Sequence, residues 1–369
     1  MKTQAAVLWE VGKEWSVEEV ELADPLPGEV RVKLASSGLC HSDEHLLTGD
    51  LPAALPMVGG HEGAGIVEAV GAGVTSLAEG DHVVLSFIPS CGRCAACSTG
   101  HQNLCELGSF LLAGTEIAGG QRINARGHGV GTMCCLGTFS PYVVAHENSA
   151  IKIRDDVPLD KASLVGCGVT TGYGSAVYAA GVRAGHTAVV VGCGGIGINA
   201  IQGARIAGAQ YIVAVDPIAF KRESAMLYGA THTMPSLDEA HGLVQDLTWG
   251  RMANSAIITT GVADGQMMAQ VMAVLGKNGT AVVTSLGRFD RMDVNLSLLD
   301  LTLYEKSVRG ALFGSANPRF DIPRILDLYM DGILKLDELV TRTYPLSQVN
   351  EGYQDMRDGR NLRGMIVFD

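Results

Sequence analysis

The stretch Val189-Val190-Val191-Gly192-Cys193-Gly194-Gly195-Ile196-Gly197 decides the fold of the second half of this chain. It matches the pattern G-x-G-x-x-G, with an apolar β-branched run before it and a segment of helical length after it. Gly192 allows a tight turn, Gly194 lets the backbone approach a pyrophosphate, and Gly197 lets the helix pack against the strand. The helix amino terminus would present free N–H groups to phosphates. The sequence therefore predicts a dinucleotide site formed by Gly192, Gly194, Gly195, Ile196 and Gly197.

A carboxylate at the end of the next apolar run supports this interpretation. Asp216 comes nineteen residues after Gly197, where it would accept hydrogen bonds from the adenosine ribose. The same carboxylate would repel a 2′-phosphate, and the following Pro217-Ile218-Ala219 supplies no arginine to offset that repulsion. We therefore predict NAD rather than NADP. The alternative is a glycine turn of a doubly wound fold that holds no nucleotide.

Two hydrophobic patterns divide the chain around this turn. From about residue 185 to 312, apolar runs alternate with segments of helical length, which indicates a parallel sheet covered on both faces. Residues 1 to about 155 instead show period-two alternation between glycines, as in Glu29–Leu34 and Gly65–Val70. Such alternation is typical of antiparallel strands in a twisted or barrel-like sheet. Periodicity does not decide to which domain the tail after Pro318 belongs.

Composition excludes several classes of protein. The chain is 47% hydrophobic and 18% charged, and this composition argues against a disordered or fibrous protein. Its length of 369 residues is enough for two domains. A net charge of −12 without a concentrated basic cluster argues against nucleic-acid binding. No apolar run reaches the length of about eighteen residues needed to span a membrane. Since the amino terminus also does not resemble a signal peptide, we expect a cytoplasmic protein.

Four of the nine cysteines are clustered. Cys91, Cys94, Cys97 and Cys105 fall within fifteen residues, so one tight loop could place four thiolates around a tetrahedral zinc. Four sulfur ligands leave no open position, so this zinc would be structural. An iron–sulfur cluster is a competing interpretation, although the longer last gap and the absence of a proline after Cys105 count against it. Unliganded packing of the four thiols is the other alternative.

A second set of candidate ligands is dispersed over three motifs, Cys40-His41-Ser42-Asp43-Glu44-His45, Gly59-Gly60-His61-Glu62-Gly63 and Gly166-Cys167-Gly168. Taken singly, each is a weak signal, because a lone histidine or cysteine is more often part of a core. Two cysteines and one histidine with a vacant fourth position would form a catalytic zinc site. Next to NAD, such an ion would be the electrophile that acidifies an alcohol.

These motifs, together with Gly166-Cys167-Gly168-Val169-Thr170-Thr171-Gly172-Tyr173-Gly174, resemble in their order the medium-chain, zinc-dependent alcohol dehydrogenase family. The resemblance covers essentially the whole chain and implies an α/β protein. It implies a GroES-like, β-rich catalytic domain formed by residues 1–168 and 313–369, and a Rossmann coenzyme domain with a doubly wound parallel sheet at 169–312. It assigns the catalytic zinc to Cys40, His61 and Cys167, with water or substrate as the fourth ligand.

The resemblance also implies roles for individual side chains. Asp43 would orient the zinc histidine, Glu62 would be the acid behind the metal, and Ser42 and His45 would relay a proton. The expected cofactor contacts are Thr171 to the nicotinamide, Lys221 to the ribose, Arg363 to the pyrophosphate, and His41 where many relatives carry a pyrophosphate-binding arginine. The candidate walls of the alcohol pocket are Phe87, Leu136 and Phe139. Outside the family context, capping, packing and surface roles would be the favoured explanation of these residues.

The predicted function is reversible oxidation of a primary or secondary alcohol to an aldehyde or ketone, with two zinc ions per chain and NAD. The amino-acid sequence most resembles those of actinobacterial nicotinoprotein dehydrogenases. This resemblance implies that NAD(H) could stay permanently bound. A formaldehyde dehydrogenase acting on a thiol adduct, and a non-catalytic NAD-binding sensor or scaffold, are the alternatives. Because an exposed sheet edge of a coenzyme domain favours pairing, and because relatives are dimers or tetramers, we expect a homodimer or homotetramer.

Overall fold

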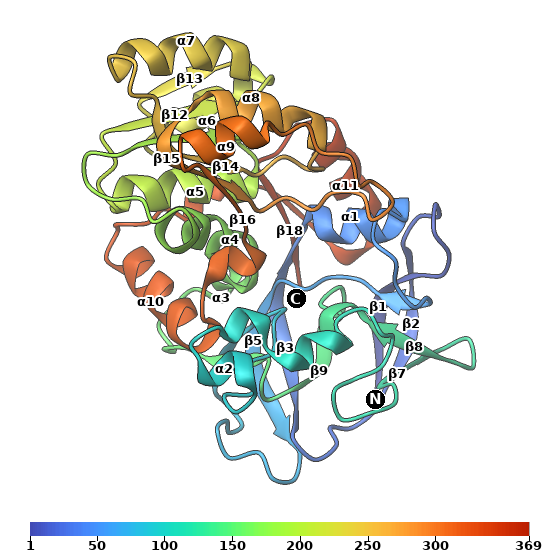
Figure 1. Ribbon diagram of the computed structural model, residues 1–369. Helices are drawn as coiled ribbons and strands as arrows, with labels where there is room; N and C mark the ends of the chain where they lie inside the picture. The colour runs from blue at the N-terminus through green and yellow to red at the C-terminus, as the bar shows by residue number, and fades with distance from the viewer. Residues whose placement is uncertain (369) are drawn as a thin grey trace. The chain divides into compact units, whose positions relative to one another are not determined.

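The computed structural model describes residues 1–368 and divides the chain into two compact units. The first unit contains Met1–Gly168 and the chain from Asn317 onward, and the second contains Val169–Ala316 (Figure 1). No helix within residues 1–368 combines the length and the apolar character that crossing a membrane requires.

The first unit is rich in β-structure. One sheet closes into a barrel in the order β1 (Lys2–Leu8), β2 (Ser16–Leu22), β7 (Ile123–Ala125), β8 (His128–Thr132) and β4 (Met57–Val58). A second sheet has the order β10 (Ala150–Lys152), β6 (His82–Leu85), β5 (Gly63–Val70), β3 (Glu29–Gly38), β18 (Arg363–Val367) and β17 (Val340–Tyr344), with β9 (Tyr142–His146) also paired to β3. The helices of this unit are α1 (His41–Thr48), α2 (Ala95–Ser98), α3 (Leu159–Ala162), α10 (Pro318–Met330) and α11 (Val349–Arg357).

The carboxyl-terminal tail belongs to the first unit. Strand β18 pairs antiparallel with β3, so that Met365 lies opposite Gly38. Helix α10 of this tail begins at Pro318, because the fixed φ of proline suits the first helical position. The question that the sequence pattern left open is thus answered by strand pairing.

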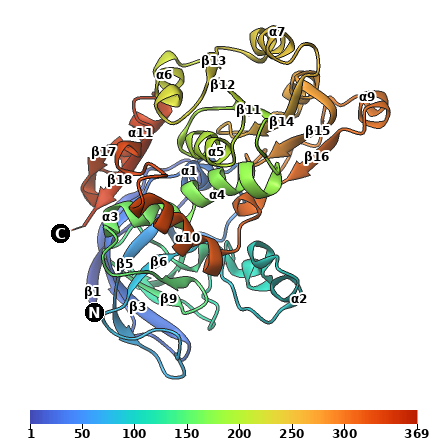
Figure 2. The same ribbon diagram turned by 90° about the vertical axis from the view of Figure 1, so that its left-hand side faces the viewer.

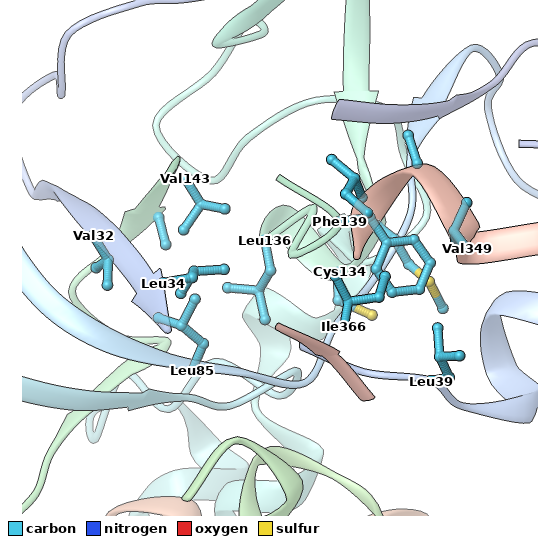
Figure 3. Packing of buried hydrophobic residues seen from close by; sticks show 14 of the residues in the cluster. Val32, Leu34, Leu39, Leu85, Cys134, Leu136, Phe139, Val143, Val349 and Ile366 are labelled. Atoms are coloured by element: carbon cyan, nitrogen blue, oxygen red, sulfur yellow. The ribbon is translucent and has the colours of Figure 1, made fainter. Parts of the chain in front are cut away.

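The core of the first unit lies between its strands and the tail. Val32, Leu34 and Leu85 come from the second sheet, and they pack in one apolar cluster with Val349 of α11 and Ile366 of β18. Figure 3 shows these side chains with Leu136, Phe139 and Val143. Burial of this cluster therefore requires both ends of the chain, since removal of apolar area from water is the main favourable contribution.

The second unit contains the predicted parallel sheet. Its order is β13 (His232–Met234), β12 (Tyr211–Val215), β11 (Thr187–Val191), β14 (Ala253–Ile258), β15 (Leu275–Val283) and β16 (Ser307–Gly310), and all pairings along this path are parallel. The helices are α4 (Gly168–Gly174), α5 (Gly195–Ile206), α6 (Ala219–Leu227), α7 (Leu237–Leu247), α8 (Met268–Ala273) and α9 (Leu298–Leu303) (Figure 2). β11 is buried at every position, which explains its unbroken apolar run.

Candidate active site and dinucleotide-binding turn

The first unit brings the three dispersed motifs together. The ligand atoms of Cys40, His61, Glu62 and Cys167 all lie within 4.8 Å of one another, and all four residues are buried. Cys40 precedes α1, His61 lies in the irregular segment between β4 and β5, and Cys167 follows a 3₁₀ turn at Ser163–Gly166. The structure therefore forms one buried Cys₂His donor set from segments that lie far apart in the sequence.

Asp43 holds the imidazole of His61. The carboxylate lies 3.3 Å from His61 Nδ1 and accepts a hydrogen bond of 2.7 Å from the backbone N–H of Gly60. His61 Nε2 is buried and has no hydrogen-bond partner among residues 1–368. An imidazole whose Nδ1 is occupied by a carboxylate has its other nitrogen available for a metal ion, so the arrangement fits zinc.

The charges of the cluster also favour a cation. A hydrogen bond from the Cys167 thiol lowers the pKa of Cys40 well below its usual range, and the contact with Cys40 together with burial raises the pKa of Cys167. Burial opposes protonation of His61, but the negative charges of Asp43 and Cys40 raise its pKa well above the usual value. A divalent ion would replace the protons on these two cysteines and the histidine, because cysteine binds a metal as the thiolate and histidine binds it as the neutral imidazole.

Glu62 lies behind the donor set and is paired with Arg363. The fully buried Glu62 carboxylate accepts a hydrogen bond of 3.0 Å from Gly168 N–H and contacts the guanidinium of Arg363. Burial, outweighing the charge of Arg363, raises the pKa of Glu62 to about 7. A Cβ atom at Gly38 would collide with this carboxylate, so glycine is required there. Arg363 is 6% exposed and lies in the first unit, and its contact with a pyrophosphate stays a prediction.

Helix α1 carries the predicted relay. Ser42 Oγ lies 3.6 Å from the sulfur of Cys40. His45, three residues later, is 4% exposed, and its Nδ1 lies 3.3 Å from Asp50. The ring of the exposed His41 is 6.5 Å from that of His45. His45 is therefore a buried group with a carboxylate beside it rather than a solvated surface residue.

The three predicted pocket residues differ in their surroundings. Phe87 packs edge-on against His61 with 5.7 Å between ring centroids, so it borders the donor set directly. Phe139 is fully buried against Trp15, at 5.6 Å between centroids, and Leu136 belongs to the same core (Figure 3). Phe139 is therefore observed in a packing role, which was the alternative to its predicted role as a pocket wall.

The cysteine loop has the dimensions of a tetrahedral sulfur site. Two of its sulfur pairs, Cys91–Cys97 and Cys94–Cys105, are 4.0 and 3.9 Å apart, and the four sulfurs lie within 4.8 Å of one another. A zinc ion with four sulfurs at about 2.3 Å requires sulfur separations of about 3.8 Å. Backbone N–H groups, that of Glu106 first, lower the pKa of Cys94 to about 6. The four predicted ligands are thus placed together around one position that a zinc ion would fit.

In the second unit, the glycine turn has the geometry that the sequence predicts. Gly192 has a φ of +93°, and a Cβ there would lie 2.9 Å from the backbone of Thr259. A Cβ at Gly197 would collide with the carbonyl oxygen of Gly192. Gly194 is the N-cap residue of α5, and apart from Gly194 and its two chain neighbours nothing in residues 1–368 lies within 4 Å of a Cβ built there. The space before this helix terminus is therefore open to a ligand.

Asp216 is held at the end of β12. Its carboxylate accepts hydrogen bonds from the N–H groups of Cys193 at 2.8 Å and Ile218 at 2.9 Å. Arg222 donates to the carbonyl oxygens of Asp216 and Pro217, at 2.7 and 2.9 Å. Arg222 was not predicted from the sequence, because it lies beyond residues 217–219, although the spacing of one helical turn would have placed it near Asp216.

Two other predicted cofactor residues belong to this unit. Thr171 lies on α4, and its buried hydroxyl has no hydrogen-bond partner in the described part of the chain. Lys221 lies partly exposed on α6. A buried hydroxyl without a partner costs free energy unless a ligand satisfies it, so Thr171 fits a role in binding.

Comparison with known proteins places this site in a family. The family description "Alcohol dehydrogenase GroES-like domain" matches residues 26–155, and "Zinc-binding dehydrogenase" matches residues 195–330. An NDMA-dependent alcohol dehydrogenase of Amycolatopsis methanolica is 54% identical over 367 residues, which cover 100% of this chain and 99% of the relative. The chain belongs to the zinc-dependent alcohol dehydrogenases.

Solved structures agree with this family. An alcohol dehydrogenase zinc-binding domain protein from Burkholderia ambifaria has a TM-score of 0.94 and 33% identity, covering 100% of this chain and 99% of that one. Benzyl alcohol dehydrogenase from Acinetobacter calcoaceticus has a TM-score of 0.93 and 30% identity, with 100% of both chains covered. The predicted α/β fold class, with a GroES-like and a Rossmann-type domain, is confirmed for this zinc-dependent alcohol dehydrogenase. It is an enzyme, as the sequence predicts.

One residue beside the predicted zinc ligands of this alcohol dehydrogenase was not predicted from the sequence. Tyr353 of α11 donates a hydrogen bond to the carbonyl oxygen of Cys40, at 3.4 Å. No local pattern identifies it, because the two residues are 313 positions apart. Only the pairing of the tail with the first unit brings them together.

Proposed function

We propose that this protein oxidises a primary or secondary alcohol reversibly, releasing a proton and transferring a hydride to NAD. The observation that carries the proposal is the buried Cys40, His61 and Cys167 donor set, whose imidazole Nε2 lacks a partner in residues 1–368. A set of three protein ligands leaves one position for a substrate, as a catalytic zinc requires.

Each residue around this donor set has a separate proposed role in the reaction. When bound, zinc supplies a Lewis acid that lowers the pKa of an alcohol hydroxyl, and the nicotinamide supplies the hydride acceptor. Asp43 fixes the orientation of His61, and Phe87 limits access of water to one side of that ring. Ser42 Oγ would accept the hydroxyl proton while giving up its own, and His45, whose Nδ1 lies beside Asp50, would pass that proton to solvent.

The cofactors proposed for each chain are two zinc ions and one NAD. The Cys91, Cys94, Cys97 and Cys105 cluster would hold the second, structural zinc, because its four sulfurs fill a tetrahedron. Asp216 at the end of β12 supports NAD over NADP, since a buried carboxylate disfavours a second phosphate. The 54% identity to an NDMA-dependent enzyme supports the further proposal that NAD(H) stays bound during turnover.

The proposed assembly is a homodimer or homotetramer. Strand β16 ends the sheet of the second unit, and all four of its residues are exposed. Three leucines of the neighbouring helix α9 are also exposed, Leu298, Leu299 and Leu303. A free strand edge beside an apolar surface favours pairing with a second copy.

One experiment tests the reaction and the state of the cofactor together. The purified protein is mixed with alcohols without added NAD while the near-ultraviolet absorbance of reduced nicotinamide is followed. A stoichiometric rise is the expected result, and it would show that resident NAD accepts the hydride. A rise only after NAD is added would mean an exchanging dehydrogenase and would contradict permanent binding.

Two controls separate the alternatives. Cys40→Ala should remove activity and one zinc per chain, while Cys134→Ala, which removes another buried thiol of the same unit, should keep both zinc ions. Full activity of Cys40→Ala would contradict the metal assignment. A rate that depends strictly on an added thiol would instead support a dehydrogenase of thiol adducts.

A further inference from the structure

The phenol of Tyr353 is placed deep in the first unit. Tyr353 lies on α11, is 0% exposed, and is one of the largest fully buried side chains. Its ring stacks on Trp15 with 6.3 Å between centroids and packs edge-on against Phe139 at 6.2 Å. Two aromatic rings therefore fix the direction of the Tyr353 hydroxyl group, since aromatic pairs of this geometry resist reorientation.

The hydroxyl meets the backbone of a predicted zinc ligand. It donates to the carbonyl oxygen of Cys40 at 3.4 Å, and the same oxygen accepts a hydrogen bond from the N–H of Asp43 at 3.2 Å. Burial first, and then the negative charges of Asp43 and Cys40, raise the pKa of Tyr353 well above its ordinary value. The hydroxyl therefore keeps its proton and acts as a donor.

This contact lies at the start of α1. Cys40 is the N-cap residue of that helix, and its side chain makes no capping hydrogen bond to the described residues. The Cys40 sulfur belongs to the donor set instead, so the orientation of its peptide group depends on other contacts. A helix end without a side-chain cap needs such partners to fix its first turn.

Close packing of α11 supports the same point. A Cβ atom at Gly352, the residue before Tyr353, would collide with the side chain of Leu39, the residue before Cys40. Helix α11 thus packs directly against Leu39, the residue that precedes Cys40. Close contact of this kind transmits a change in one segment to the other, since protein interiors are densely packed.

We propose that Tyr353 is a positioning residue of the open zinc site, whose hydroxyl fixes the Cys40 carbonyl and with it the sulfur of Cys40 and the first turn of α1. Asp43, which orients His61, lies in that first turn. One phenol from the carboxyl-terminal tail therefore sets two of the three ligands. The inference rests on the proposed function, in that Cys40 and His61 are taken to bind the ion.

The test replaces the hydroxyl and keeps the ring. In Tyr353→Phe, a chromogenic chelator should remove one zinc per chain about 10-fold faster than in the unmodified protein, as expected for loss of a contact outside the ligand set. In protein whose open site is reloaded with Co²⁺, the sulfur-to-cobalt absorption bands should also shift. A purely structural role for the hydroxyl would not move these bands.

A matched control removes another buried hydroxyl of the same unit. Tyr344 is 2% exposed and donates to Asp355 at 2.8 Å, outside the donor set. Tyr344→Phe should reduce thermal stability by a similar amount, yet leave the metal release rate within about twofold and the cobalt bands unchanged. If both variants unfold at a lower temperature and release metal at the same rate, Tyr353 is not a positioning residue.

Two further outcomes are distinguishable. If Tyr353→Phe does not fold, Tyr353→3-fluorotyrosine keeps the ring and strengthens the donor, so metal release should slow, and an unchanged rate would overturn the inference. Cys40→Ala shows whether the site holds metal at all. If it contains as much zinc as the unmodified protein, the proposed function itself fails, and this inference fails with it.

Discussion

At the scale of single residues, the candidate site includes side chains that contact the predicted zinc ligands as well as those ligands themselves. Asp43 is fully buried and joins the Gly60 N–H to the imidazole of His61. This role could be predicted from the motif and the resemblance. The contact of the Tyr353 hydroxyl with Cys40 could not, because it arises from tertiary packing.

The effect of losing the Asp43 charge can be measured. Asp43→Asn keeps the size of the side chain but no longer stabilises the metal-binding form of His61. We expect the affinity of the open site for zinc to fall about 10- to 100-fold. Competition with a chelator measures this affinity. Asp355→Asn, which changes a buried carboxylate bound to Arg342, Tyr344 and Arg360, is the control, and an equal loss of zinc there would contradict the argument.

A second buried acid predicts a dependence of stability on pH. Glu116 is 2% exposed and accepts a hydrogen bond of 2.7 Å from Thr132. Burial, aided by the charge of Glu29 and opposed by Thr132 and Arg122, raises its pKa to about 7. The folded protein therefore binds a proton there that the unfolded chain has lost above about pH 4.5. Stability from this group is complete at low pH and is lost as pH rises toward 7.

Glu116→Gln should remove this part of the pH dependence. The urea midpoint of the variant, relative to that of the unmodified protein, should be higher at pH 8 than at pH 5. The exposed Glu79 serves for a control, since Glu79→Gln should leave the difference between the two pH values unchanged. A constant offset of Glu116→Gln at both pH values would show that Glu116 does not titrate in this range.

At the scale of elements, the sequence predicts those helices and strands whose conformation is set by residues close together in the chain. The apolar run before Gly192 forms strand β11, and helix α5 follows the glycine turn as expected, because the apolar run and the glycine turn each specify their own conformation. The position of β18 could not be predicted, since period-two alternation does not name the partner strand. The same holds for the assembly of Cys40, His61 and Cys167, which the resemblance supplied.

Strand β18 is therefore the element whose contribution is most informative to test. Ile366 is 0% exposed and packs in the core of the first unit, whereas Val367 beside it is 42% exposed. Ile366→Ala should destabilise the first unit by about 2–5 kcal/mol through the cavity it leaves. Val367→Ala should change stability by less than about 1 kcal/mol. Thermal unfolding measures both, and equal effects would mean that β18 is not part of this core.

At the scale of the whole molecule, the described chain is a pair of units that each carry one part of the chemistry. The donor set and the cysteine loop lie in the first unit, and the glycine turn lies in the second. A net charge of −12 agrees with a substrate that is a small alcohol rather than a polyanion. Composition and pattern could predict this division, but they could not locate the surface by which copies would associate.

The free edge of the second unit gives the prediction at this scale. If β16 pairs with the same strand of a second copy, a charge placed there would face an identical charge across the two-fold axis and would also be removed from water. Val308→Asp should therefore convert the dimer or tetramer to smaller species, measured by light scattering during gel filtration. Val308 is 42% exposed in the single chain, and Val11, 55% exposed in the first unit, supplies the control Val11→Asp. Dissociation of the control alone would place the interface on the first unit, and an unchanged mass for both variants would exclude pairing through β16.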